Sequence, residues 1–274
     1  MLRSLVQKSN LMNRIIFSVI LFVAALPSEA QQKEGKVIYQ RTVQLQIRMA
    51  AGDAPEQDIA RTRTDKFELN FANDQMAYRQ MEEDIQDEAF STGGGVMIRT
   101  MGGGVDDVTF CDFRNARKVE SREFFDKKFL IIDSIRRENW KLGEETKSIL
   151  NHLCRKATSQ RIGKRMTMSM DNGKMERKEV ADTSVLVAWF TTDIPVAAGP
   201  EVQGQLPGLI LELQTNNGKT VYKAIEISPE ANKKEIKEPT KGKKVSPDEY
   251  TKERNKMMDE MQNNGRGNFR IRMD

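Results

Sequence analysis

Apolar and polar residues alternate in short segments along most of the chain after residue 30, and this alternation limits the fold more than any other feature. Every second residue is apolar in segment 43–49, and segments 67–71 and 209–213 repeat the pattern. A period of two places apolar side chains on one face of a β-strand. Segment 185–190 is apolar throughout, which indicates a strand buried on both faces.

Turn-forming residues separate these segments. Asn73-Asp74, Asp171-Asn172-Gly173 and Asn216-Asn217-Gly218 each stand between two predicted strands, as in a tight hairpin. About nine or ten short strands follow from this pattern. The sequence therefore predicts a mainly β fold: a curved antiparallel sheet, a sandwich or a half-open barrel.

The C-terminal part has a different character. From Pro229 the chain is polar and rich in lysine, and Ser246-Pro247-Asp248-Glu249 is a typical helix start. We expect one C-terminal α-helix ending near Gln262, before Asn263-Asn264-Gly265. Its weak apolar stripe would consist of Tyr250, Arg254, Met257 and Met261.

The first thirty residues have the features of an export signal. An apolar run from Ile15 to Leu26 follows Arg14, and Ser28 and Ala30 supply the small side chains that a signal peptidase requires. The run is shorter than the roughly 20 residues that span a bilayer. An uncleaved anchor is the alternative, and Met12 is a second candidate start. We expect an exported protein, periplasmic or outer-membrane-associated, with no transmembrane segment in the mature chain.

Three regions follow from these patterns. Residues 1–30 are expected to be a signal peptide, residues 31–228 an antiparallel β domain, and residues 229–274 a lysine-rich linker with the C-terminal helix. The tail from Lys233 to Lys244 also contains glutamates, so a solvated linker is favoured over a segment that binds an anionic envelope surface.

The composition excludes several classes of function. The chain has 44 Lys and Arg against 40 Asp and Glu, and the net charge of +4 falls to +2 without residues 1–30. No excess of cations is left to follow a phosphate backbone, so we expect no nucleic-acid partner. One histidine excludes sites that need two imidazoles, and two cysteines exclude a four-thiolate metal site.

The histidine and the two cysteines are the candidates for a reactive site. His152 and Cys154 lie two residues apart in a predicted strand, so both side chains are expected on one face. A catalytic dyad also needs an orienting group and a donor-lined cleft, which no nearby residue supplies. We therefore predict no catalytic residue. Cys111 and Cys154 are candidates for a disulfide in an exported chain, provided that their strands are adjacent.

Met166, Met168 and Met170 form a row on one face of a predicted strand. Thioethers are the ligand type that selects Cu(I). Methionines that fill a core face show the same alternation, and this interpretation is favoured. The three methionines, with His152 and Cys154, are thus only weak metal candidates, and no cofactor is expected.

Two triple glycines, Gly93–Gly95 and Gly102–Gly104, bracket a mostly apolar segment. Ordering such glycines costs much entropy, so a flexible flap is expected, which would cover any cavity inside the sheet. Candidate lining residues of such a cavity are Phe110, Phe129, Trp189 and Leu211, although burial in an ordinary core is the commoner fate of such side chains.

The segment Gly204-Gln205-Leu206-Pro207-Gly208-Leu209-Ile210 resembles the motif that names the GLPGLI family of exported proteins from Bacteroidetes. Trp189-Phe190-Thr191, Asp193-Ile194-Pro195 and Gly199-Pro200 are similar to the blocks that precede it, and the resemblance extends over most of the chain after about Thr109. Gln205 departs from the motif, which has glycine there. The family has no established activity, so the resemblance implies compartment and fold. By analogy only, the fold is similar to periplasmic lipoprotein carriers.

The motif also has a physical interpretation. Pro207 sets its own φ and pushes Leu206 into an extended conformation, and Gly208 permits backbone that other residues avoid. A structural corner at the start of a strand is therefore favoured over a ligand site at Gly204, Leu206, Pro207, Gly208, Leu209 and Ile210.

These observations predict a non-enzymatic exported envelope protein that binds an apolar ligand or a protein partner. The alternative is a soft-metal or redox role through Met166, Met168 and Met170 with His152 and Cys154.

Overall fold

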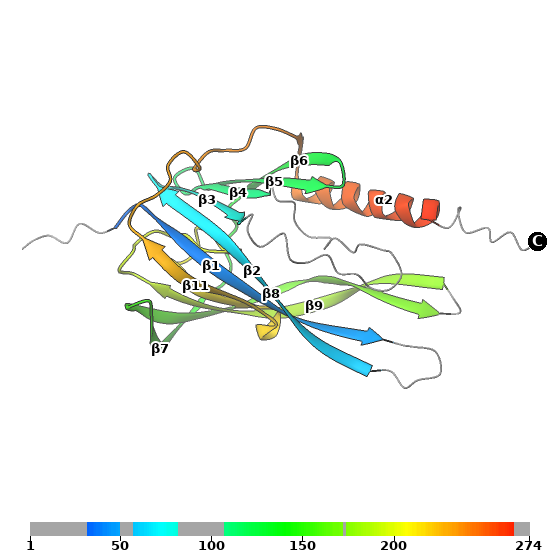
Figure 1. Cartoon of the computed structure of the whole chain (residues 1–274), viewed down its shortest axis with the longest axis horizontal. Coiled ribbons are helices and arrows are strands. Elements are labelled where there is room, and N and C mark those ends of the chain that lie inside the picture. Colours follow the sequence, from blue (N-terminus) through cyan, green and yellow to red (C-terminus); the bar gives the residue numbers. More distant parts are fainter. Residues whose placement is uncertain (1–31, 50–56, 82–106, 172–173, 266–274) are drawn as a thin grey trace, which may run out of the picture. The chain divides into compact units, whose positions relative to one another are not determined.

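The computed structural model describes residues 32–49, 57–81, 107–171 and 174–265, and the strands among them form one sheet (Figure 1). The strands of the first half are β1 (Gly35–Met49), β2 (Gln57–Ala72), β3 (Gln75–Gln80), β4 (Val108–Asp112), β5 (Arg117–Phe124) and β6 (Lys127–Ser134). The second half comprises β7 (Lys141–Ile149), β8 (His152–Asp171), β9 (Lys174–Thr191), β10 (Leu209–Thr215), the 3-10 turn η2 (Asn216–Gly218) and β11 (Thr220–Ser228). A short strand β12 (Lys243–Val245) and helix α2 (Pro247–Gly265) follow.

The order of the strands follows the chain in two runs. Strands β1 to β6 are consecutive neighbours, and so are β7 to β11; the two runs meet where β1 pairs with β11. All these pairs are antiparallel, and the sheet is open, with β12 and β7 at its two edges. The predicted fold class, a curved antiparallel sheet with a C-terminal helix, is confirmed.

Tight turns form where the sequence predicts them. Asn73 and Asp74 have φ of 54° and 62°, and they join β2 to β3. Asn216 and Asn217 have φ of 50° and 54°, and they join β10 to β11. Hairpin turns need such left-handed backbone, which asparagine, aspartate and glycine adopt at low cost. β8 and β9 pair up to Asp171 and Lys174, on either side of residues 172–173, which lie outside the described residues.

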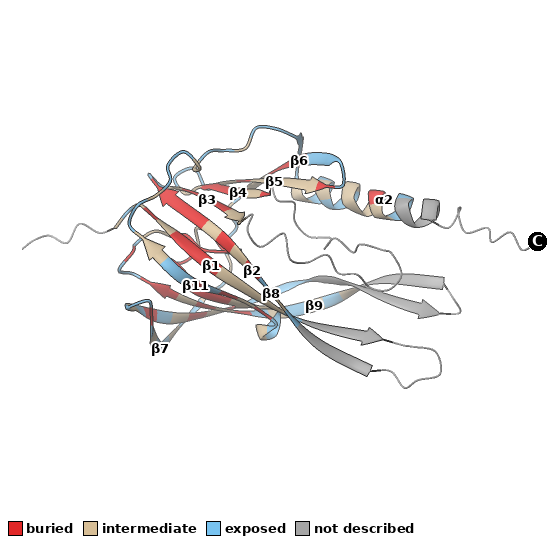
Figure 2. Ribbon diagram, viewed as in Figure 1, coloured by how far each residue is buried: buried red, intermediate tan, exposed pale blue. Residues whose placement is uncertain are grey.

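The largest core cluster contains side chains from both halves of the sheet. Figure 2 marks buried residues in red on strands of both halves. Val37, Met76 and Cys111 come from the first half, and Cys154 and Leu211 from the second. Strands far apart in a flat sheet cannot share one core, so the sheet must bend around this cluster. A neighbouring cluster is formed by β8, β9, β10 and β11 together with Val202 and Leu206 of the connection between β9 and β10.

Helix α2 begins as the sequence predicts. The Glu249 carboxylate accepts a hydrogen bond of 2.7 Å from the Ser246 backbone N–H, and the Glu249 N–H donates to the Ser246 hydroxyl. This reciprocal pair is a capping box. Two residues of the expected stripe, Tyr250 and Met257, pack against Phe129 of β6, with the Tyr250 and Phe129 rings 5.4 Å apart.

Most residues of the segment 233–244 after β11 are exposed to solvent, and two ion pairs also join this segment to the sheet. Arg79 of β3 forms an ion pair with Glu235, and Arg117 of β5 forms one of 2.7 Å with Glu238. Lys243–Val245 then pairs with β6 as the sheet's parallel strand. The glutamates that dilute the charge of this segment thus bind it to arginines of the sheet, an arrangement that composition alone does not reveal.

Residues 1–30, the expected signal peptide, and the Gly93–Gly104 flap lie outside the described residues. In the part of the chain that the structure describes, no helix is long and apolar enough to cross a membrane.

Candidate functional site

The connection between β9 and β10 carries the motif and folds back on the first residues of β10. The Leu209 N–H donates to the Ile194 carbonyl and the Ile210 N–H donates to the Ala198 carbonyl, each at 3.0 Å. Leu206, Leu209 and Ile210 are buried, whereas Pro207 is exposed. The motif therefore anchors the connection in the core, as its structural interpretation predicts.

Two glycines of the motif have steric reasons to be glycine. A Cβ atom on Gly208 would overlap the Thr191 carbonyl oxygen, which belongs to rigid backbone. Gly204 has a φ of +72°, and its Cβ would lie 2.7 Å from a side-chain carbon of Ile135. At both positions a neighbouring group lies too close to the backbone for a side chain to fit, and Gly204 also adopts a left-handed backbone conformation.

Gln205, the departure from the family motif, has a defined role. Its side-chain oxygen accepts hydrogen bonds from the Trp140 indole N–H at 2.8 Å and from the Glu138 backbone N–H at 3.0 Å. A glycine at this position could accept neither bond. The departure thus links the motif to the segment before β7.

A polar pocket of about 290 Å³ lies on the sheet between β1 and the second run of strands. Cross-strand pairs share a face of a sheet, and Arg41 pairs with Asp65 of β2 and with Tyr222 of β11. The lining residues are Arg41, Val43, Arg161, Ser184, Leu186, Glu201, Thr215, Asn216, Thr220 and Tyr222.

Arg41 is held from two sides. Its guanidinium donates to one Asp65 carboxylate oxygen at 2.5 and 3.0 Å, and it lies 4.7 Å from the centroid of the Phe67 ring. Arg63 binds the other oxygen of Asp65 at 2.8 Å. Burial opposes the charge on Arg41, but Asp65 outweighs it, so the pKa of Arg41 is raised and the group stays cationic.

Glu201 reaches the pocket from the motif connection. It accepts a hydrogen bond of 2.9 Å from the Tyr222 hydroxyl, and its own φ is 59°, an uncommon value for glutamate. Burial, and then the charge of Glu201, raises the pKa of Tyr222, so its hydroxyl remains a donor. Arg161 on β8 is paired with Glu138. The pocket therefore combines two guanidinium groups, an accessible carboxylate, and hydroxyl and amide groups.

The His152–Cys154 pair does not form a dyad. The His152 ring nitrogen Nδ1 lies 3.2 Å from the Asp193 carboxylate, while the Cys154 thiol donates to the His152 backbone carbonyl at 3.6 Å. Burial raises the pKa of Cys154 to about 11 and that of Cys111 to about 12. Both cysteines are free in the structure, so the candidate disulfide is not formed, although both thiols lie in the same core cluster.

The candidate metal residues cannot act together. Met166 and His152 are at opposite parts of strand β8, and 14 residues of extended chain span about 46 Å. The two sets therefore cannot bind one ion. The side chains of Met166, Met168 and Met170 lie outside the described residues. No group of three His, Cys, Asp or Glu that could hold a metal occurs among the residues that are described.

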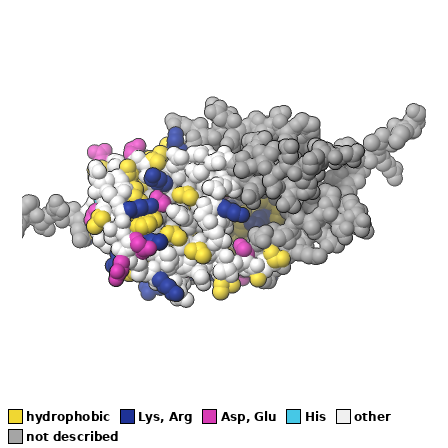
Figure 3. All heavy atoms as spheres, turned by 90° about the horizontal axis from the view of Figure 1, so that it is seen from below, with side chains coloured by type: hydrophobic (Ala, Val, Ile, Leu, Met, Phe, Trp, Pro, Cys, Tyr) yellow, Lys and Arg dark blue, Asp and Glu magenta, His cyan; other side chains and the backbone are white. Residues whose placement is uncertain are grey.

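None of the four candidate cavity-lining side chains lines the polar pocket. Phe110, Phe129 and Leu211 are buried in the core. Trp189 is half-buried and is covered by Lys147, whose ammonium lies 4.3 Å from the ring centroid and 2.8 Å from Glu212. On the described part of the face in Figure 3, basic, acidic and apolar side chains are interspersed.

No local sequence pattern indicates the pocket. Arg41, Arg161, Glu201 and Tyr222 extend over most of the chain and form no local motif. Glu201 lies between two blocks that carry the family resemblance, Gly199-Pro200 and the motif that begins at Gly204. Its position directly after Gly199-Pro200 is the one local signal.

No curated protein matches the chain. Two crystal forms of PNGF-II are similar at 15% identity, with TM-scores of 0.47 and 0.46. These matches cover 79% and 78% of this chain and 32% of each PNGF-II chain, so the chain spans about a third of the length of those structures. A family model described as "Protein of unknown function (Porph_ging)" matches residues 140–212, from Trp140 to Glu212, and so includes the motif.

Proposed function

We propose that this chain is an exported, non-enzymatic binding protein of the cell envelope, and that the pocket lined by Arg41, Arg161 and Glu201 is its ligand site. The observation that carries the proposal is the convergence of these charged groups from β1, β8 and the motif connection in one concave site. Each already has a protein partner that fixes its position. Binding sites gain affinity from such preorganisation.

The chemistry of the described residues supports binding rather than catalysis. Both thiols are buried and protonated at neutral pH, so neither is an activated nucleophile. The carboxylate nearest to the His152 ring belongs to Asp193 in the motif connection, and this pair lies apart from the pocket lining.

The pocket favours a polar ligand over the apolar one that the sequence predicts. Eight of its ten lining residues carry polar side chains, and Val43 and Leu186 are the apolar ones. An apolar ligand would desolvate the polar groups without replacing their hydrogen bonds with water, which is unfavourable.

Native mass spectrometry of the protein isolated from its own envelope tests the proposal. We expect a chain that begins at Gln31 and carries a small bound molecule. The pocket variant Arg161→Ala with Ser184→Phe should lose that mass, because it removes a donor and fills the space. Arg155→Ala should keep the bound molecule. Arg155 is an exposed arginine of β8 that donates to the Gly143 carbonyl and does not line the pocket.

Three results would contradict the proposal. A bound molecule retained by the pocket variant would place the site elsewhere. If every preparation contains the chain without a bound molecule, the proposal that this protein binds a ligand is wrong. A bound molecule that changes in mass during incubation with the protein would identify an enzyme.

A further inference from the structure

We infer that the ligand of this pocket is a small, neutral, polyhydroxylated molecule: a monosaccharide, either free or at the end of a longer glycan. This inference rests on the function proposed above and adds the chemical class of the ligand.

The charges of the pocket argue for a neutral ligand. Arg41 and Arg63 share the Asp65 carboxylate, and Arg161 pairs with Glu138. Glu201 supplies the third carboxylate against these three guanidinium groups, so the charges around the pocket balance. A carboxylate or phosphate ligand would therefore find guanidinium groups that already have counter-ions, and it would meet the charge of Glu201. A cation would face the two guanidinium groups. Either charge would therefore be desolvated in a site whose own charges already balance, which is unfavourable.

The hydrogen-bonding groups argue for a ligand that both donates and accepts at several points. Guanidinium groups only donate, and the Glu201 carboxylate only accepts. The hydroxyl and amide side chains of Ser184, Thr215 and Asn216 do both. A sugar hydroxyl also donates and accepts, so a ring that carries several of them can satisfy this mixed lining.

The remaining walls suit the carbon skeleton of such a ring. Val43 and Leu186 offer apolar contact on the same pocket surface. The volume of about 290 Å³ is at the small end for ligand sites. One sugar unit is therefore the expected content, with any further units outside the pocket.

Glu201 occupies a conformation that fits this role. Its left-handed φ of 59° is sparsely populated by residues with a Cβ and persists only where the surroundings hold it. Tyr222 binds one carboxylate oxygen, Oε1. The pocket thereby holds an acceptor at a fixed place, available to a ligand hydroxyl.

The test uses the mature chain, residues 31–274, with ligand-observed NMR and calorimetric titration. The probes are the neutral sugars glucose, galactose, mannose and N-acetylglucosamine, the anions gluconate and glucose 6-phosphate, and the cation glucosamine. We expect a neutral sugar to bind more tightly than every charged probe. Thr215→Val with Glu201→Gln should weaken binding about tenfold or more, the size of one or two hydrogen bonds, and Arg155→Ala should leave it unchanged.

The outcomes separate this inference from the proposed function. If no neutral sugar binds, or if a charged probe binds most tightly, the ligand class is wrong. The pocket itself still stands if a molecule purified with the protein is lost in the Arg161→Ala and Ser184→Phe variant. If that molecule is retained as well, the proposed function is also wrong.

Discussion

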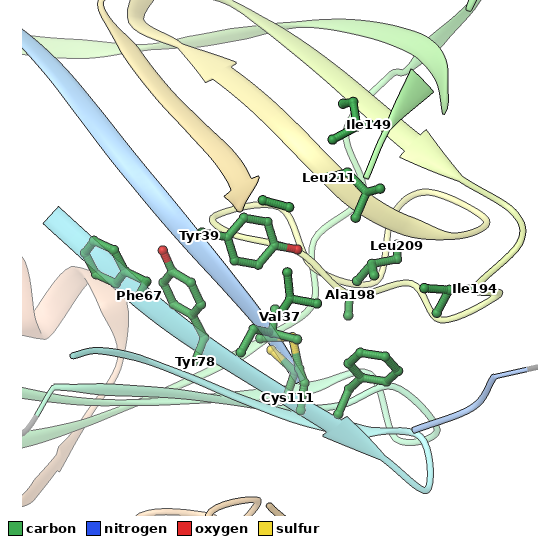
Figure 4. Close-up of a cluster of buried hydrophobic side chains, with 14 of the residues drawn as sticks. Val37, Tyr39, Phe67, Tyr78, Cys111, Ile149, Ile194, Ala198, Leu209 and Leu211 are labelled. Atoms are coloured by element: carbon green, nitrogen blue, oxygen red, sulfur yellow. The ribbon is translucent and has the colours of Figure 1, made fainter. Parts of the chain in front are cut away.

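The Tyr39 hydroxyl donates a hydrogen bond of 2.6 Å to the carbonyl oxygen of Ile210, across 171 positions of the sequence. Tyr39 is fully buried, and its ring lies among the side chains of the main core cluster (Figure 4). The bond joins β1 to the last residue of the motif. It therefore connects the two runs of strands at the point where the motif connection enters β10.

Tyr39→Phe should destabilise the protein by about 1–3 kcal/mol, because it leaves the buried Ile210 carbonyl without this donor. Tyr78→Phe is the matched control. Tyr78 is also buried, but its hydroxyl has no hydrogen-bond partner among the described residues, so its removal should cost little. Urea unfolding of the two variants measures the difference. If the two variants lose equal amounts of stability, the hydrogen bond from Tyr39 to Ile210 does not contribute measurably to stability.

Gly208→Ala should destabilise the fold by about 1–3 kcal/mol or more, because the new Cβ would overlap the Thr191 carbonyl and the backbone would have to move. Gly163→Ala on β8 provides the contrast. Nothing lies within 4 Å of a Cβ at that position, so this change should be neutral or slightly stabilising. Thermal unfolding compares them, and a tolerated Gly208→Ala would contradict the steric explanation of the motif.

Gln205→Gly, which restores the glycine of the family motif, should lower stability by about 1–2 kcal/mol, because the Trp140 indole N–H and the Glu138 N–H lose their shared acceptor. Gln205→Glu keeps an acceptor and should retain most of the stability. Chemical unfolding followed by tryptophan fluorescence reports both values. A Gln205→Gly protein as stable as the wild type would show that other groups satisfy the two donors.

The thiols should resist modification in the folded protein at pH 8. Burial raises the pKa of Cys111 to about 12 and that of Cys154 to about 11, from 9.0. A group whose pKa is raised on folding contributes stability below its unfolded pKa, and that stability is lost as the pH rises toward the folded value. Stability should thus decline between pH 9 and pH 11.

The variant Cys111→Ala with Cys154→Ala isolates this effect, since lysines and tyrosines titrate in the same range. Its decline over that pH interval should be smaller than that of the wild type. Labelling with an aromatic disulfide reagent gives a second measure: reaction only after unfolding is expected, and rapid labelling of the native protein would contradict the burial of both thiols.

Acid should weaken the start of helix α2. The hydrogen bond from the Ser246 N–H lowers the pKa of Glu249 below 4.5. The ionised Glu249 carboxylate therefore stabilises the folded protein above pH 4.5, and this stabilisation is lost as the pH falls through the pKa of the folded state. Circular dichroism of the full chain from pH 6 to pH 3 measures helix content. Glu249→Gln should remove the pH-dependent loss of helix content. Glu260→Gln, further along the same helix, should retain that loss.

Local patterns of the sequence predict several elements of the fold, although the described residues form more strands than the nine or ten short ones expected, and four of these strands are 15 to 20 residues long. Alternation at segment 43–49 predicts part of β1, and Asn73-Asp74 and Asn216-Asn217-Gly218 predict two hairpin turns that the structure contains. The capping box at Ser246 predicts the start of α2. Each of these signals depends on residues a few positions apart, because backbone geometry and period-two alternation are local properties.

Tertiary structure alone decided which distant residues meet. The pairing of β1 with β11 brings Arg41 to Tyr222, and the motif connection adds Glu201 to them. Tertiary structure also determines that the largely exposed lysine-rich segment forms ion pairs with Arg79 and Arg117 of the sheet. These contacts depend on strand order and register, and both are set by the packing of one shared core rather than by any short stretch of sequence.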